Sequence, residues 1–430
     1  RQYGLFDYYG APDATSVVIA MGSVCETAEQ AVDYLNAQGG EVGLLKVRLY
    51  RPFAIDYFLN ALPKTVERIA VLDRLKTPGA PGEPLYMDVV AAFAGKKAPL
   101  IIGGRYGLGS KDTLPEDIIA VFANLNSDSP RSGFTISIVD DISNSSLPRG
   151  QKIDMLPAGT IQCKFWGLGS DGTVGANKQA VDIIGDKTDL YAQAYFDYDS
   201  KKSGGLTCSH LRFGKKPIKA PYLISNADFI CCSNQAYVHT YDLLHGLKRG
   251  GIFLLNTVWD DEQLARELPA DMKRYLAENE INFYAINAVE IARNLGLGNR
   301  TNMVMQAAFF KLTGVIPVEQ AILALDESIV KAYGKKGQKI VDMNKEAVQA
   351  GVKQYRKVQV PAAWAQAEDE IKQPADEPDF IKNIQRPMCA ARGNELPCSA
   401  FLGREDGTFP LGGSAYEKRG VASFVPMWIS

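Results

Sequence analysis

The chain has 430 residues, which predicts two or three globular units at a typical size of about 150 residues each. Hydrophobic residues make up 46% and charged residues 22% of it, as in soluble proteins with sizeable cores. The 47 basic and 49 acidic residues nearly cancel, so the net charge gives no sign of a face that binds nucleic acid. No stretch approaches the roughly 20 apolar residues of a membrane span, and no signal peptide is recognisable. Neither a membrane nor a nucleic acid is an expected partner.

The cysteines are too scattered for a disulfide framework or a metal site. Their number is odd, no pair forms a CxxC motif, and most stand in apolar runs, where a free thiol packs as a small hydrophobe. Together with three histidines, they predict neither a zinc site nor an iron–sulfur cluster within this chain, and a reducing compartment fits best. The residues concerned are Cys25, Cys163, Cys208, Cys231, Cys232, Cys389, Cys398, His210, His239 and His245.

Short apolar runs alternate with helical patterns over residues 1–150. Ser16–Met21 is β-branched and long enough for a buried strand, and Ser23 with Glu26 predicts a capping box for a helix through Leu35. Strands that alternate with helices predict right-handed crossovers and a parallel sheet with helices on both faces. The further strands expected here are 42–47, 69–72, 100–102 and 135–139.

A second α/β unit is predicted after a linker, residues 140–156, that is rich in Asn, Ser, Pro and Gly. A helix is expected at about 172–184, and the pattern is helical almost throughout from 302 to about 356. The expected strands of this unit are 160–165, 190–196, 229–231, 252–255 and 282–285.

These patterns predict an α/β fold with two successive open domains of mainly parallel sheets, residues 1–150 and 151–362, followed by an extended connecting segment, 363–430. The chain begins with Arg1 rather than Met and ends in the apolar run Trp428–Ser430. We therefore expect an internal piece of a longer polypeptide, with part of its chemistry outside this chain.

The sharpest local signal is a glycine-rich turn that follows the strand 160–165 and opens a helix. Gly167, Gly169 and Gly172 match G-x-G-x-x-G in the strand-to-helix context that the phosphate-binding fingerprint requires. Glycine permits positive φ and close backbone approach, and unpaired amides at a helix start attract phosphate oxygens. Lys178, further along the helix, would add positive charge. The alternative is a turn that uses glycine only for tight packing.

A lysine-rich loop follows the second strand of the same sheet. Lys201 and Lys202 precede Ser-Gly-Gly in a cationic loop rich in hydrogen-bond donors, which by itself is typical of a solvated surface turn. Loops at the carboxyl ends of strands form the ligand crevice of an open α/β sheet, so we expect this loop and the glycine-rich turn to line one site. Dinucleotide binding remains an alternative, because Asp197 or Asp199 at the end of a strand could bind the ribose of a dinucleotide.

Two further stretches favour structural roles. Gly103–Lys111 also links a strand to a helix, but its glycine spacing fits no phosphate fingerprint. Lys46–Pro52 is a basic strand end, for which an ion pair or a contact between domains is the default interpretation. No Ser/His/Asp set and no G-x-S-x-G elbow is present, which argues against hydrolase chemistry.

Several of these stretches together resemble pyruvate:ferredoxin (flavodoxin) oxidoreductases. Those near the end are similar to the part of that family which leads into its ferredoxin-like cluster domain. The resemblance covers essentially the whole chain in long, ordered motifs. The stretches that carry it are Lys46–Phe53, Gly167–Lys178, Phe196–Gly205, Ser209–Arg212, Arg392–Pro397, Asp406–Pro410 and Glu417–Arg419.

The resemblance implies that residues 1–150 are a transketolase-C-terminal-like domain, 151–362 a γ-type domain, and 363–430 the connector to an iron–sulfur domain. The family decarboxylates pyruvate oxidatively with thiamine pyrophosphate and Mg²⁺, passes electrons through [4Fe–4S] clusters to ferredoxin or flavodoxin, and transfers the acetyl group to coenzyme A. Its thiamine-binding and cluster-binding domains lie outside this chain, so we assign no catalytic and no metal-binding residue. The resemblance also implies a homodimer in the cytoplasm, or in a reducing organelle matrix in a eukaryote.

What the resemblance carries over to these residues is the binding of coenzyme A by the γ-type domain. Backbone amides of the turn would face the phosphates, and the lysines would balance their charge. The expected CoA-binding residues are Gly167, Gly169, Ser170, Gly172, Lys178, Lys201 and Lys202.

Three other functions stay open. A pyruvate:NADP⁺ oxidoreductase would share this core and add a flavin reductase module beyond residue 430. A non-catalytic scaffold would keep the γ-type domain for assembly alone. An NAD-dependent dehydrogenase would use the same glycine-rich turn, although the lysine-rich loop argues against it.

Overall fold

The computed structural model describes residues 3–199, 205–369 and 377–416. The chain divides into two compact units: the first contains the chain up to residue 155, the segment 219–222 and the chain from 376 onward, and the second contains 156–218 and 223–375. Each unit holds one sheet with helices on both faces, so the predicted pair of successive α/β folds is confirmed.

The first unit is built on a mainly parallel sheet. Its strands are β1 (Phe6–Gly10), β2 (Ser16–Met21), β3 (Val42–Val47), β4 (Arg68–Asp73), β5 (Leu100–Arg105) and β6 (Phe134–Thr135). Their order is β1-β3-β2-β4-β5-β6, and only the edge strand β1 is antiparallel to its neighbour among the described pairs. The predicted last strand, 135–139, is wrong in its extent, because only two residues pair with β5.

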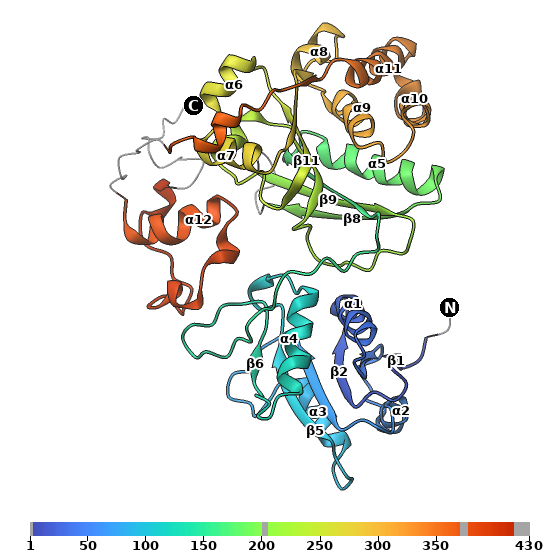
Figure 1. Cartoon of the computed structure of the whole chain (residues 1–430), viewed down its shortest axis with the longest axis vertical. Coiled ribbons are helices and arrows are strands. Elements are labelled where there is room, and N and C mark those ends of the chain that lie inside the picture. Colours follow the sequence, from blue (N-terminus) through green and yellow to red (C-terminus); the bar gives the residue numbers. More distant parts are fainter. Residues whose placement is uncertain (1–2, 200–204, 370–376, 417–430) are drawn as a thin grey trace, which may run out of the picture. The chain divides into compact units, whose positions relative to one another are not determined.

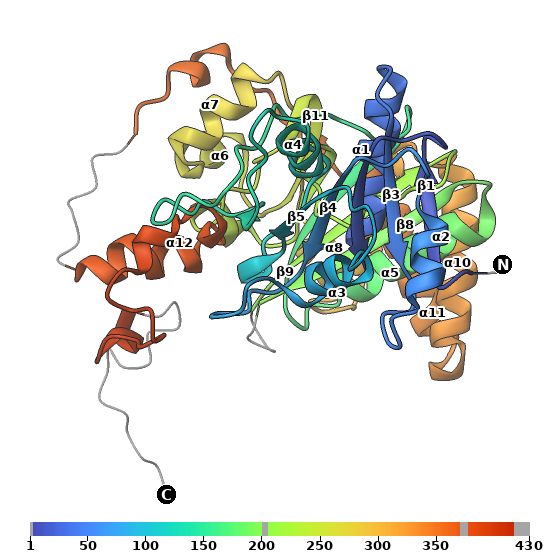
Figure 2. The same ribbon diagram turned by 90° about the horizontal axis from the view of Figure 1, so that it is seen from below.

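Both faces of this sheet are buried, which explains the unbroken apolar run of β2. The helices are α1 (Val24–Ala37), α2 (Ile55–Ala61), α3 (Pro84–Ala92) and α4 (Pro115–Leu125). Val18 of β2 packs on the side of α1 and α4, and Ile19 packs on the side of α2 and α3 (Figure 2). The predicted capping box of α1 is wrong, because the backbone of Ser23 is already helical and its side chain makes no capping hydrogen bond.

The second unit has a mixed sheet. Its strands are β7 (Ile161–Leu168), β8 (Tyr191–Tyr198), β9 (Leu206–Gly214), β10 (Ala227–Cys232), β11 (Leu247–Asn256), β12 (Asn282–Ile286) and β13 (Arg356–Lys357). They lie in the order β13-β12-β11-β10-β7-β9-β8. β7, β10, β11 and β12 are parallel to one another, whereas β9 and β13 are antiparallel to their neighbours.

The sequence did not predict β9, and its place in the sheet matters. β9 forms a hairpin with β8 and lies between β8 and β7. Its buried residues include polar ones, Ser209, His210 and Arg212, each no more than 4% exposed. Polar side chains break the apolar run by which a buried strand is recognised, so the sequence pattern did not indicate this strand.

The helices of the second unit cover its two sheet faces unequally. They are α5 (Thr173–Lys187), α6 (Asp261–Glu267), α7 (Ala270–Glu278), α8 (Ala288–Asn294), α9 (Asn302–Thr313), α10 (Val318–Tyr333) and α11 (Gln338–Lys353). α5 and α8 to α11 share one apolar core, while α6 and α7 pack in the other (Figure 1). The rings of Phe165, Phe229 and Phe309 meet in the larger core at centroid distances of 5.1 to 5.7 Å.

A buried ion cluster joins the segment 219–222 to α1. Glu29, which is 5% exposed, accepts from Lys46 Nζ at 2.7 Å and from Lys219, and Tyr222 donates to the Gln30 side chain at 2.8 Å. Burial raises the pKa of Glu29, but hydrogen bonds and charge from the two ammonium groups outweigh it, so the pKa is lowered overall. Lys46, at the basic end of β3, therefore forms an ion pair, as one of the two interpretations from the sequence expected.

The last described segment, 377–416, consists of short helical turns and α12 (Arg386–Cys389), and it belongs to the first unit. Lys111 donates to the carbonyl of Asn394 at 2.7 Å, and the Cys398 amide donates to the Val139 carbonyl at 3.0 Å. These contacts attach the segment to loops of the first unit. Within the described ranges, no helix combines the length and the apolar character that a membrane crossing requires.

Candidate functional site

The glycine-rich turn joins the carboxyl end of β7 to the start of α5. From β7 the chain first forms β8 and β9 on one side of that strand, and then crosses to β10 on its other side. The carboxyl end of β7 therefore lies at the point where the strand order reverses, which is where open α/β sheets bind ligands. The fold thus places the strongest motif of the sequence at the favoured position.

Asp171 holds this turn together, and sequence reasoning missed it. Its Oδ2 accepts from the amide of Leu168 at 2.8 Å, and its Oδ1 accepts from the amide of Thr173 at 2.7 Å. The hydroxyl of Ser233, just after β10, lies 3.1 Å from Oδ2, and the side-chain amide of Asn302 donates to the Asp171 carbonyl at 3.2 Å. An Asp beside a helix start is a recognisable capping signal that could have identified this residue.

Two of the predicted glycines are required by packing. Gly172 has φ +86°, and a Cβ there would lie 2.3 Å from the side-chain nitrogen of Asn302. A Cβ at Gly167 would lie 2.8 Å from the side chain of Thr173. The turn itself therefore explains both glycines, and any case for a ligand rests on the backbone amides.

The amides of the turn divide into engaged and open donors. Gly169 donates to the carbonyl of Gly205 at 2.7 Å, so its predicted role toward a phosphate would require this bond to open. Four other amides at the start of α5 meet no acceptor within the described part of the chain. They belong to Ser170, Gly172, Val174 and Gly175.

Of the three predicted lysines, only Lys178 is among the described residues. Lys178 is exposed on α5, with its Nζ 5.4 Å from the ring centroid of Phe196 on β8. Lys201 and Lys202 lie outside the described residues. The loop that carries them rejoins the sheet at Gly205, which accepts the hydrogen bond from the turn. The described end of the lysine-rich loop and the glycine-rich turn are therefore in direct contact.

The dinucleotide interpretation loses its geometric basis. β9 separates β8 from β7, so Asp197 and Asp199 do not follow the strand next to the turn, where a dinucleotide fold places its ribose-binding acid.

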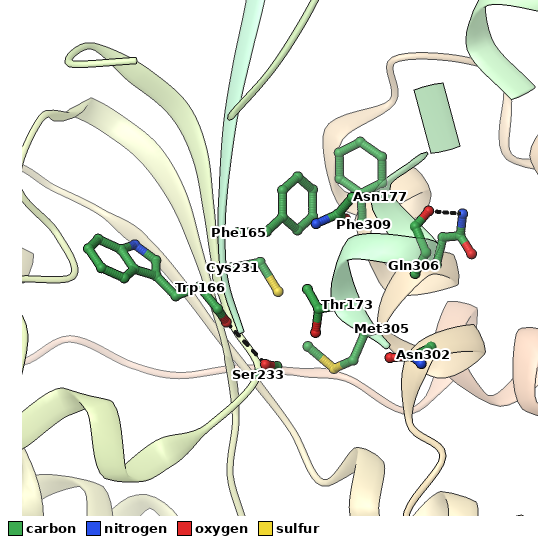
Figure 3. Close-up of a pocket in the computed structure, with 11 residues that line it drawn as sticks. Phe165, Trp166, Thr173, Asn177, Cys231, Ser233, Asn302, Met305, Gln306 and Phe309 are labelled. Atoms are coloured by element: carbon green, nitrogen blue, oxygen red, sulfur yellow. Dashed lines mark hydrogen bonds between the residues drawn. The ribbon is translucent and has the colours of Figure 1, made fainter. Parts of the chain in front are cut away.

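A pocket lies between the start of α5 and α9 (Figure 3). Its volume is about 400 Å³ when the solvent at its mouth is included, and its described lining carries no charged side chain. Figure 3 shows Thr173 and Asn177 beside Met305 and Phe309. The side-chain nitrogen of Asn177 and the side-chain oxygen of Gln306, each residue 5% exposed, have no partner among the described residues. Unpaired amides in such a space favour ordered water rather than a phosphate.

The described residues do not fit a metal cofactor. Among them, no group of three or more His, Cys, Asp or Glu side chains is placed to hold a metal ion. The cysteines are free, and burial raises the pKa of the Cys163 and Cys231 thiols well above the usual value.

Comparison with known proteins identifies the family. Residues 162–354 match the family described as pyruvate ferredoxin/flavodoxin oxidoreductase, 14–118 match pyruvate:ferredoxin oxidoreductase core domain II, and 366–422 match a domain of unknown function. Over its full length, the chain is 59% identical to the pyruvate-flavodoxin oxidoreductase of Enterobacter agglomerans and 54% identical to the pyruvate:ferredoxin oxidoreductase of Moorella thermoacetica. The chain belongs to the pyruvate ferredoxin/flavodoxin oxidoreductase family. The resemblance read from the sequence is confirmed.

The chain spans 37% of the Enterobacter protein and 36% of the Moorella protein, so it corresponds to a portion of a pyruvate ferredoxin/flavodoxin oxidoreductase. It is also 49% identical to the mitochondrial pyruvate dehydrogenase [NADP(+)] of Euglena gracilis, of which it covers 24%. Among solved structures, the pyruvate oxidoreductase subunit PORC of Thermotoga maritima aligns over 46% of this chain and 99% of its own, with 20% identity and a TM-score of 0.38.

Proposed function

We propose that this chain is part of a pyruvate:ferredoxin or pyruvate:flavodoxin oxidoreductase, which decarboxylates pyruvate oxidatively and transfers the acetyl group to coenzyme A. The observation that carries the proposal is the identity of 54% and 59%, over the whole chain, to two oxidoreductases of these names. The family resemblance implies thiamine pyrophosphate, Mg²⁺ and [4Fe–4S] clusters in the complete enzyme. Because the described residues do not gather their ligands, we assign these groups to other parts of the assembly.

Within this enzyme, we assign the binding of coenzyme A to the second unit. The turn after β7 lies at the switch point of the sheet and offers open amides at the positive end of a helix of 15 residues. Of the predicted residues, Gly167 serves packing and Gly169 holds the neighbouring loop, which leaves the amides of Ser170 and Gly172 as phosphate donors. Lys178, Lys201 and Lys202 are the predicted counter-charges.

The anion must overcome the negative charge of Asp171. Two unit charges 6 Å apart in water repel each other by roughly 0.7 kcal/mol. A lysine at a similar distance would attract the phosphate by a comparable amount, so we propose that the predicted lysines offset this carboxylate. The lysines are therefore the residues to test first.

The test is the apparent affinity of the full-length enzyme for coenzyme A after the double substitution Lys201→Ala and Lys202→Ala. Two lost phosphate contacts should raise the KM for coenzyme A about tenfold or more, which corresponds to about 1.4 kcal/mol. The matched control is Lys215→Ala with Lys216→Ala, an exposed pair that directly follows β9. Because β9 runs antiparallel to β7, this control pair lies at the opposite edge of the sheet. An unchanged KM in the first variant would contradict the assignment.

The electron acceptor and the catalytic role are open to separate tests. Two relatives are named for flavodoxin and ferredoxin, while the Euglena relative is named for NADP⁺. We propose ferredoxin or flavodoxin because those two relatives share more of this sequence, and direct reduction of NADP⁺ by the full-length enzyme would contradict this.

For the alternative of a non-catalytic scaffold, equilibrium binding of coenzyme A decides, because a scaffold would not bind it.

We also propose a homodimer in the cytoplasm or in a reducing organelle matrix. Free thiols at all seven cysteines fit a reducing compartment. The dimer rests on the family resemblance alone, and the mass of the native full-length enzyme in solution tests it.

A further inference from the structure

The described segment 377–416 has almost no core of its own. It lies within the match to a domain of unknown function, and with it the chain returns to the first unit after completing the second. Among its described side chains, only Ile381, Ile384 and Gln385 are buried, whereas Leu411 is fully exposed. A segment of about 40 residues with so small a core does not fold independently. Its conformation therefore depends on what it contacts in the first unit.

Lys111 binds the backbone of this segment. The lysine follows β5, and its Nζ donates to the carbonyl of Asn394 at 2.7 Å and to the carbonyl of Leu396 at 3.3 Å. Hydrogen bonds from an ammonium group are stronger than those between neutral groups. Lys111 therefore holds a stretch of backbone that belongs to no α-helix or strand.

Asp141 binds the same segment a few residues further on. It follows β6, and its two oxygens accept from the amide of Ser399 at 2.9 Å and from the Ser399 hydroxyl. Hydrogen bonds from the hydroxyl and the amide of Ser399 lower the pKa of Asp141. Beside them, the amide of Cys398 donates to the carbonyl of Val139 at 3.0 Å. The loop after β6 therefore binds the segment both through a side chain and through its backbone.

The loop that carries Asp141 is fixed by its own hydrogen bonds. The preceding carboxylate, Asp140, accepts from the amide of Ser143 at 3.0 Å and from the amide of Ser145 at 3.1 Å. These bonds lie within the loop, so its conformation does not depend on the segment that it binds. The first unit thus offers an ordered surface to a segment that is not ordered by itself.

We propose that residues 394–399 form a strap that Lys111 and Asp141 fasten to the first unit, and that this strap gives the segment 377–416 its conformation. β5 and β6 are parallel neighbours, so the loops that follow them lie at the same edge of the sheet, and the strap bridges the two loops. Both fastenings are polar contacts near the surface, which open at a lower free energy than an apolar core. The strap is therefore able to release while the first unit stays folded.

The experiment follows amide hydrogen exchange in the full-length enzyme by mass spectrometry. In the double variant Lys111→Ala with Asp141→Ala, peptides that contain residues 394–399 should exchange about tenfold faster, because the contacts that protect the amides of Cys398 and Ser399 are weakened. Peptides from β4 and β5 should keep their exchange rates, because the first unit stays folded. Ser399→Ala, which removes only the hydroxyl donor of the strap, should accelerate its exchange less.

The matched control is Lys97→Ala with Asp128→Ala, which changes two exposed residues in the loops before β5 and β6, at the opposite edge of the sheet. In this control the strap should exchange as in the natural protein. Unchanged exchange of the strap in the variant of Lys111 and Asp141 would overturn the proposal, and so would equally faster exchange in β4 and β5. Should that variant fail to fold, Ser399→Ala decides, because faster exchange confined to the strap supports the proposal and unchanged exchange overturns it.

Discussion

In each unit an aspartate binds backbone amides at the start of a helix, but the two helix starts differ in the amides that remain open. In the first unit, Asp73 at the end of β4 accepts from the amides of Leu85 and Tyr86 at 3.0 and 3.1 Å and so caps α3. In the second unit, Asp171 lies in the turn after β7 and accepts from the Thr173 amide at the start of α5 and from the Leu168 amide at the end of β7. Asp73 satisfies two amides at the start of α3 that the helix itself cannot satisfy, and Asp171 satisfies one such amide of α5.

The difference lies in the donors that remain. α3 begins with Pro84, which has no amide proton, and the Met87 amide is bonded to the Glu83 carbonyl, so the first turn has no open donor among its described residues. In α5, the amides of Val174 and Gly175 stay open beside those of the preceding turn. A glycine-rich or aspartate-capped turn therefore indicates a ligand site only where some backbone amides have no acceptor within the protein.

The largest effect is expected at Asp73. It is 2% exposed, and Asp73→Ala would leave two amides without an acceptor in a buried place, which should cost about 3 kcal/mol in the free energy of unfolding. Chemical denaturation of the full-length enzyme measures this loss. Asp171→Ala, at a more exposed turn, should cost about 1 kcal/mol. Equal losses at the two positions would contradict the comparison.

The two units should also differ in their response to acid. All three histidines lie in the second unit, and burial, with the charges of Lys164 and Arg212, lowers the pKa of His210 to about 3. Below the pKa of about 6.5 in the unfolded chain, the unfolded state binds one more proton than the folded state, so stability falls as the pH drops. Between pH 6.5 and 5 the second unit should lose about 2 kcal/mol.

The variant His210→Asn tests this pH dependence. His210 Nδ1 accepts from the Ile224 amide at 3.1 Å, and the side-chain oxygen of asparagine can accept the same hydrogen bond without titrating. Denaturation curves at pH 7 and pH 5 should therefore show less acid sensitivity in this variant. The control, His245→Asn at an exposed position, should keep the acid sensitivity of the natural protein, and a loss of it there would count against the role of His210.

The smallest effects are expected at two glycines of the same turn. Gly172→Ala forces a left-handed residue and a Cβ against Asn302, so it should cost about 1–2 kcal/mol. Gly175 lies inside α5, and a Cβ there meets nothing within 4 Å, so Gly175→Ala should stabilise the protein by about 0.5–1 kcal/mol. Thermal melting of both variants measures the contrast, and a shift of the same sign in both would contradict the account of the turn.

The sequence predicted the features that depend on apolar periodicity and local turn chemistry. β2, β3, α5 and the helices from α9 to α11 follow from such patterns. β9 does not, because Ser209 and Arg212 are buried polar residues whose burial depends on tertiary contacts rather than on the local sequence. Without β9, the sequence pattern placed β8 next to β7, and dinucleotide binding therefore remained an alternative.

The candidate site was predicted in its position but not in its details. The motif located the turn, and the pattern of strands placed it at the carboxyl edge of the sheet. The sequence could not show that the Gly169 amide is engaged by Gly205, or that Asp171 closes the turn, because both depend on how the backbone folds back. Which amides remain open is therefore a property of the three-dimensional structure.

We propose that the turn after β7 receives the phosphates of coenzyme A. An experimental structure of the full-length enzyme with coenzyme A tests it most directly. We expect phosphate oxygens within about 3 Å of the amides of Ser170 and Gly172, with the Asp171 carboxylate still bound to Leu168 and Thr173. A structure in which these amides face solvent while the coenzyme A phosphates lie at another part of the enzyme would contradict it.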